Sequence, residues 1–129
     1  GDGLNVRDWI HVEDHCSAIL EILKHGRFGE TYLVGCNGER TNREVLQLIC
    51  EVMGFDAGKI QVVADRSGHD LRYAIDATKL SNELDWKPKH SEFEDGIRET
   101  IEWYEANFEW WESQKTEAEN FYLRVAGQT

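Results

Sequence analysis

Two arginines, a histidine and a tyrosine lie close together within residues 65–73 (DRSGHDLRY), in a chain that is otherwise acidic. Arg7 adds a guanidinium beside Trp9, and two further arginines flank the segment around Asn42. A guanidinium donates paired hydrogen bonds to phosphate oxygens, and each charge-assisted bond contributes about 1.5–3 kcal/mol. The pattern therefore favours a small anion-binding pocket. The alternative is that these arginines form ordinary ion pairs with nearby aspartates: Asp8, Asp65, Asp70 and Asp76.

The other chemistry-bearing motifs argue against catalysis by this chain alone. His11 and His15 have the i, i+4 spacing of helical zinc ligands, but the pattern is HVEDH rather than HExxH, and we expect no metal site. Residues 1–3 (GDG) lack the third glycine and the preceding strand of a dinucleotide loop. No tyrosine is followed four residues later by lysine, and no GxSxG elbow or P-loop occurs. We expect neither catalytic nor cofactor-binding residues here.

The net charge of the chain restricts its possible binding partners. The chain has 14 Lys+Arg against 25 Asp+Glu, a formal net charge of −11. It therefore lacks the basic surface by which proteins bind nucleic acid or anionic lipid. The surplus is uneven, because residues 91–129 hold 10 acidic and 3 basic residues, whereas most arginines precede them. We expect neither a nucleic-acid nor a membrane partner.

Length and cysteine content set further bounds. A chain of 129 residues, 40% of them hydrophobic, has room for one small domain. No apolar run approaches the ~20 residues of a membrane span. The three cysteines, Cys16, Cys36 and Cys50, are an odd number without CxxC spacing, which favours a reducing cytoplasm over a disulfide framework. The first residue is Gly rather than Met, which indicates either processing or a piece of something longer.

Alternating strands and helices must position these residues. β-Branched and aromatic residues predict short strands at 6–12, 31–34, 60–64 and 73–75. Asp14 is the predicted N-cap of a helix whose apolar stripe is Cys16, Ile19, Leu20 and Leu23.

Three further helices are predicted downstream. Thr41 and Glu44 form a capping box before a helix that ends at Gly54. Asp76 can cap a brief helix, and an amphipathic helix covers 91–112. The fold class is α/β (mixed α+β), with few short strands, three or four helices and no complete Rossmann domain.

A family resemblance makes these patterns specific. Residues 5–15 (NVRDWIHVEDH) resemble a segment of the dTDP-glucose 4,6-dehydratases, extended short-chain dehydrogenases that act on sugar nucleotides. The likeness continues through 65–70 (DRSGHD), 72–77 (RYAIDA) and 86–88 (WKP), and it covers about residues 1–112. Generic sugar-nucleotide epimerases share the VRDxxVxD theme but not the run DRxGHDxRYAIDA at residues 65–77.

The resemblance implies a two-part enzyme. In this family an N-terminal Rossmann domain carries NAD and the Tyr/Lys pair, and a smaller C-terminal domain closes over the sugar nucleotide. Residues 1–112 would be that C-terminal, substrate-binding domain, and 113–129 a polar tail of partial order. The whole lyase would oxidise C4 of dTDP-glucose, eliminate water across C5–C6 and return the hydride to C6. The present residues would bind substrate without NAD and be inactive alone.

Site residues follow from the resemblance by position. Arg7 and Arg66 match arginines that hold the diphosphate, Asn42 and His69 match polar substrate contacts, and Tyr73 lies nearby. Ser67 stands where the family usually has proline, which removes a restraint on φ.

The implied partners are a dTDP-sugar, the missing N-terminal Rossmann domain and a second copy of this chain. Residues 30–34 match a strand of the Rossmann sheet, and without its neighbours we expect self-association through that edge or a rearranged strand. Alternatives are a free-standing nucleotide-sugar-binding module, a truncated remnant, or part of a related epimerase or decarboxylase.

Overall fold

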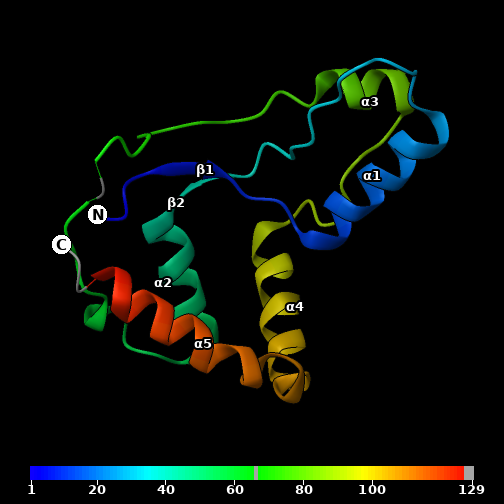
Figure 1. Ribbon diagram of the computed structural model, residues 1–129. Helices are drawn as coiled ribbons and strands as arrows, with labels where there is room; N and C mark the ends of the chain where they lie inside the picture. Colours follow the sequence, from blue (N-terminus) through cyan, green and yellow to red (C-terminus); the bar gives the residue numbers. More distant parts are fainter. Residues whose placement is uncertain (66, 127–129) are drawn as a thin grey trace. The chain divides into compact units, whose positions relative to one another are not determined.

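The computed structural model (Figure 1) describes residues 1–65 and 67–126, with side chains through residue 121. The chain divides into two compact units, Gly1–Ile97 and Arg98–Thr129. Within the described residues there are five α-helices, one short 3-10 helix and two strands, which confirms a mixed α/β fold without a complete Rossmann domain.

The sheet is a single antiparallel pair. β1 (Val6–Asp8) pairs with β2 (Glu39–Thr41), so that Arg7 lies opposite Arg40. The predicted strand 6–12 is thus shorter, because the chain turns into a helix at Val12. One isolated parallel bridge joins Val6 to Arg72.

The strands predicted at 31–34, 60–64 and 73–75 are wrong. Residues 31–34 and 60–64 have no regular secondary structure, and the bridge at Arg72 falls just before the third segment. The 3-10 helix η1 (Ala57–Lys59) immediately precedes the second segment. Suitable side chains do not make a strand unless another segment supplies the hydrogen bonds.

Helix α1 (Val12–His25) begins earlier than predicted. Its N-cap is His11, whose Nδ1 accepts the Glu13 amide at 3.3 Å, whereas Asp14 is buried within the first turn. The helix packs through Ala18 and Ile22, and the predicted apolar stripe of Cys16, Ile19, Leu20 and Leu23 is exposed.

The core of the first unit lies between α1 and α3 (Thr78–Leu84). Ala18, Leu80 and Trp86 are buried there, and the Trp86 indole donates to Ser17 Oγ at 3.0 Å. Asp76 Oδ1 accepts the Thr78 amide at 2.9 Å, although the cap position itself is Ala77.

Helix α2 (Asn42–Met53) confirms the predicted capping box and stop. Thr41 Oγ1 accepts the Glu44 amide at 3.1 Å, and Glu44 Oε2 accepts the Thr41 amide at 2.7 Å. Gly54 ends the helix in the left-handed region, at φ 71°, where a side chain would be strained.

Replacing Thr41 by alanine removes half of this box and is expected to lower the free energy of unfolding by about 1 kcal/mol. The measurement is urea unfolding followed by circular dichroism. Thr41→Ser keeps the acceptor oxygen and should retain most of the stability; an equal loss in both variants would contradict the role of the hydroxyl as a cap.

The predicted helix 91–112 is two helices, α4 (Phe93–Ala106) and α5 (Phe108–Ala126). The break falls at Asn107, whose side-chain amide donates to the Trp103 carbonyl at 2.8 Å. Around it, aromatic rings meet edge to face at centroid distances of 4.8–6.1 Å: Trp103, Tyr104, Phe108, Trp110 and Trp111. Helix α5 runs past residue 113, where only partial order was expected. Within the described residues, no helix has the length and apolarity needed to cross a membrane.

Candidate functional site

Arg7, in the middle of β1, is held from several sides. Its Nη1 donates to the Val6 carbonyl at 2.6 Å, and its Nη2 donates to the Asp70 carbonyl at 2.9 Å. The guanidinium carbon lies 4.1 Å from the centroid of the Tyr73 ring. Cation–π contact and two carbonyl bonds fix the plane of the group, while a guanidinium has five N–H donors in all. The arrangement preorganises a cation that can donate to an anion.

The segment that carries Tyr73 is fastened to β1 by backbone hydrogen bonds. Val6 N–H donates to the Leu71 carbonyl at 2.8 Å, and Tyr73 N–H donates to the Val6 carbonyl at 3.4 Å. The buried Asn5 side chain donates to the same Asp70 carbonyl as Arg7, at 3.0 Å. This carbonyl therefore orients two side chains.

Asn42 joins this group through its backbone. Its amide donates to the Asn5 carbonyl at 3.1 Å, which places the first residue of α2 beside the start of β1. The structure therefore gathers Arg7, Tyr73 and Asn42 around a three-residue strand.

No described hydrogen bond joins His69 to that cluster. His69 Nδ1 lies 2.7 Å from Asp65 Oδ1, and its side chain is 17% exposed. Asp65 also lies 3.9 Å from the amino terminus of Gly1. Arg66 lies outside the described residues, so its role stays a prediction.

Arg72, in the same segment as Tyr73, forms an ion pair within the protein. Its Nε and Nη2 donate to the two carboxylate oxygens of Glu39, at 2.8 and 2.9 Å. The pair ties the segment around Tyr73 to β2 and leaves Arg72 as a structural cation. Arg7, by contrast, contacts the backbone carbonyl of Asp70. The ion-pair interpretation thus describes Arg72, although with a glutamate partner 33 residues away.

Cys36 lies close to β1 but is poorly suited to nucleophilic chemistry. Its thiol donates to the Trp9 carbonyl at 2.8 Å, and Asp8 Oδ1 accepts the Gly38 amide at 2.8 Å. Burial, followed by the negative charge of Asp8, raises the pKa of Cys36. Because the thiolate is the reactive form, a raised pKa works against nucleophilic chemistry at this cysteine.

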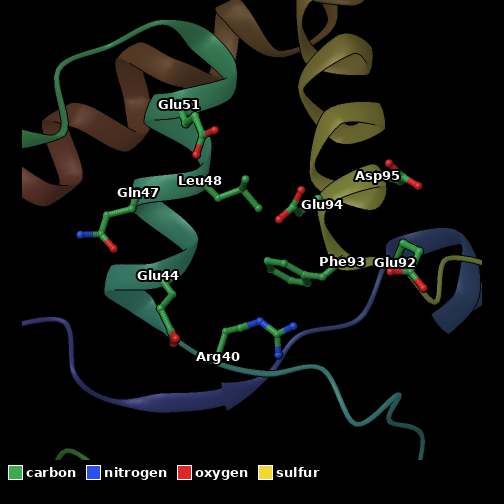
Figure 2. Close-up of a pocket in the computed structure, with 9 residues that line it drawn as sticks. All are labelled: Arg40, Glu44, Gln47, Leu48, Glu51, Glu92, Phe93, Glu94 and Asp95. Carbon is green, nitrogen blue, oxygen red and sulfur yellow. The ribbon is translucent and has the colours of Figure 1, made fainter.

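A groove of about 450 Å³ lies between α2 and the first turn of α4 (Figure 2). Its only basic lining residue is Arg40, whose guanidinium carbon lies 5.3 Å from the centroid of the Phe93 ring. Five carboxylates share the lining: Glu44, Glu51, Glu92, Glu94 and Asp95. Their charge repels phosphate, so this groove is not the anion site.

A buried carboxylate that sequence patterns missed lies at the start of α1. Asp14 is 2% exposed and accepts the Lys89 amide at 2.8 Å, the His90 amide at 3.0 Å and the His90 ring Nδ1 at 3.1 Å. Burial acts to raise the pKa of Asp14, but these bonds from Lys89 and His90 outweigh it and hold the pKa below its ordinary value. The partners are 75 and 76 residues away in the sequence, so no local residue spacing predicts these bonds.

Comparison with known proteins gives a consistent result. Residues 1–100 match the GDP-mannose 4,6 dehydratase family. The chain is 52% identical over 122 residues to a dTDP-glucose 4,6-dehydratase of Mycolicibacterium smegmatis, across 95% of this chain and 37% of that protein. The chain therefore spans little more than a third of the length of this curated relative.

Two solved structures of dTDP-glucose 4,6-dehydratases have a similar arrangement of elements. A crystal structure of dTDP-glucose 4,6-dehydratase from Bacillus anthracis, in complex with NAD, has a TM-score of 0.81 at 55% identity, over 88% of this chain and 35% of that one. DesIV, a dTDP-glucose 4,6-dehydratase from Streptomyces venezuelae with NAD and TYD bound, has a TM-score of 0.81 at 45% identity and the same coverage.

Proposed function

The chain belongs to the GDP-mannose 4,6 dehydratase family, and on this premise we propose that it is the substrate-binding part of a dTDP-glucose 4,6-dehydratase. The observation that carries the proposal is the clamp on Arg7 between the Asp70 carbonyl and the Tyr73 ring. Arg7 belongs to the family-like run 5–15, and Tyr73 belongs to the run 72–77. The guanidinium of Arg7 suits the diphosphate of a dTDP-sugar.

Each site residue has a distinct role in the proposal. Arg7 donates hydrogen bonds to one phosphate, and Arg66 donates to the other. Tyr73 keeps the Arg7 guanidinium in its plane, and Asn42 and His69 supply polar contacts around the nucleotide. None of these groups transfers a proton or a hydride, so their contribution is binding and orientation.

NAD does not fit the described residues. A dinucleotide fold needs a parallel sheet and a glycine-rich turn between strand and helix. The only strand pair of residues 1–65 and 67–126 is antiparallel, and α1 follows β1 through Trp9-Ile10-His11. In the proposal, NAD and the conversion of dTDP-glucose to dTDP-4-keto-6-deoxyglucose and water belong to the full-length enzyme, and we expect the present residues alone to be inactive.

Several exposed apolar side chains support a further domain as partner. Large hydrophobic side chains are more than half exposed at Leu23, Phe28, Val62, Val63 and Leu71. A partner domain would remove such apolar side chains from water. In the proposal the N-terminal Rossmann domain covers part of these side chains, and a second copy of the chain can compete for them.

Arg7→Ala should weaken binding of dTDP at least about tenfold, because it removes charge-assisted bonds of about 1.5–3 kcal/mol. The measurement is a titration of the chain with dTDP, followed by amide chemical shifts. Arg27→Ala is the matched control, since Arg27 is an exposed arginine paired with Glu83 on another part of the unit. Equal weakening by both variants would contradict a specific clamp.

The same titration separates the proposal from its alternatives. Shifts at the amides of Arg7, Asn42 and His69 are expected at millimolar dTDP, whereas a truncated remnant would show none there. A preference for UDP over dTDP would favour an epimerase origin. Restored dehydratase activity on adding the missing domain would exclude a free-standing module.

A further inference from the structure

We infer that His11, Glu13 and His90 form a binding site for a divalent transition-metal ion, with Zn²⁺ the best match. Each residue offers one ligand atom, and these atoms all lie within 4.8 Å of one another. Two imidazoles with one carboxylate are a donor set that Zn²⁺ binds, with a fourth position left for water. The site is separate from the proposed nucleotide site and does not depend on it.

The three ligands come from two segments far apart in the chain. His11 is the N-cap of α1, Glu13 lies in its first turn, and His90 belongs to the segment just before α4. The two rings are neighbours, with centroids 3.8 Å apart and planes tilted by 30°. The tilt matters because the nitrogen lone pairs lie in the ring planes. Lone pairs in two parallel planes cannot point at one ion, whereas those in inclined planes can.

Closing the site requires a small movement. Metal bonds of about 2.0–2.2 Å put tetrahedral ligand atoms roughly 3.5 Å apart. The exposed Glu13 side chain can swing to shorten these separations, which are at most 4.8 Å, while the His90 side chain is 7% exposed and stays fixed.

Asp14 supplies the independent observation. Metal-binding histidines almost always donate their second ring N–H to a carboxylate or carbonyl, which fixes tautomer and orientation. His90 Nδ1 lies 3.1 Å from the buried Asp14 carboxylate, which the Lys89 and His90 amides hold in place. If Nδ1–H of His90 donates to Asp14, then Nε2 is the ring atom that would bind the ion. Asp14 is thus the positioning residue of the site.

Binding of an ion by His11 would break one weak hydrogen bond. Its Nδ1 accepts the Glu13 amide at 3.3 Å, longer than the usual hydrogen bond of this kind. A metal at Nδ1 takes over that lone pair, and a metal at Nε2 moves the ring proton to Nδ1. In both cases the cap bond breaks. The ion would clasp α1 to the segment before α4.

The test is titration of the metal-free chain with Co²⁺ and Zn²⁺. We expect one ion per chain at sub-millimolar concentration, with visible Co²⁺ absorption bands that Zn²⁺ abolishes, and a Tm raised by Zn²⁺. Glu13→Gln and His11→Asn should weaken binding at least tenfold and remove the rise in Tm. Asparagine is a favourable N-cap, so His11→Asn keeps the helix start.

His15→Asn is the matched control, because His15 is an exposed histidine on the same helix and outside the cluster. It should bind both ions as the unaltered chain does. Equal weakening by His15→Asn, full binding by both site variants, or no saturable binding below millimolar metal would each overturn the inference.

Discussion

Replacing Asp14 by alanine should lower the free energy of unfolding by about 3–5 kcal/mol. The carboxylate is 2% exposed and accepts three hydrogen bonds, from the Lys89 amide, the His90 amide and the His90 ring. Alanine leaves these donors without their acceptor, and a buried unsatisfied group costs about 1–3 kcal/mol. Chemical unfolding at pH 7, followed by circular dichroism, measures the loss.

The control for this prediction is Glu21→Ala on the same helix. Glu21 lies 3.6 Å from His25 in an i, i+4 pair near the surface, so its removal should change stability by at most about 0.5 kcal/mol. A loss for Asp14→Ala no larger than for Glu21→Ala would show that the three bonds contribute little.

Acid should remove the contribution of Asp14 in a defined window. Since the folded-state pKa is lowered, the stabilisation is fully present above the unfolded-state pKa of about 3.9 and is lost as pH falls through the folded value. The stability difference between the unaltered chain and Asp14→Asn should therefore shrink below about pH 4. A difference that stayed constant down to pH 2 would contradict an ionised Asp14.

Leu80→Ala should cost about 3 kcal/mol, within the usual range for a buried leucine. Leu80 is 0% exposed and packs with Ala18 and Trp86, so its truncation leaves a cavity between α1 and α3. Leu23→Ala makes the same chemical change where the side chain is 77% exposed, and should cost less than about 1 kcal/mol. Similar losses from both variants would mean that this core does not hold the unit together.

Local signals predicted where helices occur, although not the break at Asn107, and non-local pairing decided the strands. The capping box of α2 involves residues three apart, so the pattern Thr41–Glu44 was sufficient. β2 has the sequence Glu-Arg-Thr, which no propensity scale favours strongly, and it is a strand because β1 pairs with it. At the start of α1, Asp14 was the predicted cap, but it bonds to residues 89 and 90 instead, and the cap is His11.

The candidate site was predicted as a set of residues but not as a geometry. The family resemblance named Arg7 and Tyr73, whereas their stacking depends on a backbone bridge between Val6 and Arg72. No sequence pattern pointed to His90, because its contacts with Asp14 and His11 join distant parts of the chain. A single sequence contains no local periodicity that encodes such contacts.

The bonds around β1 also have a kinetic consequence. The Asp8–Gly38 bond closes a loop of 30 residues, and the Arg7–Asp70 bond closes one of 63. Closing a loop costs chain entropy before any contact compensates for it, so non-local contacts form slowly. Helix α2 and its cap need no such closure. We therefore expect α2 to gain structure early during refolding and the guanidinium of Arg7 to reach its final orientation among the last events.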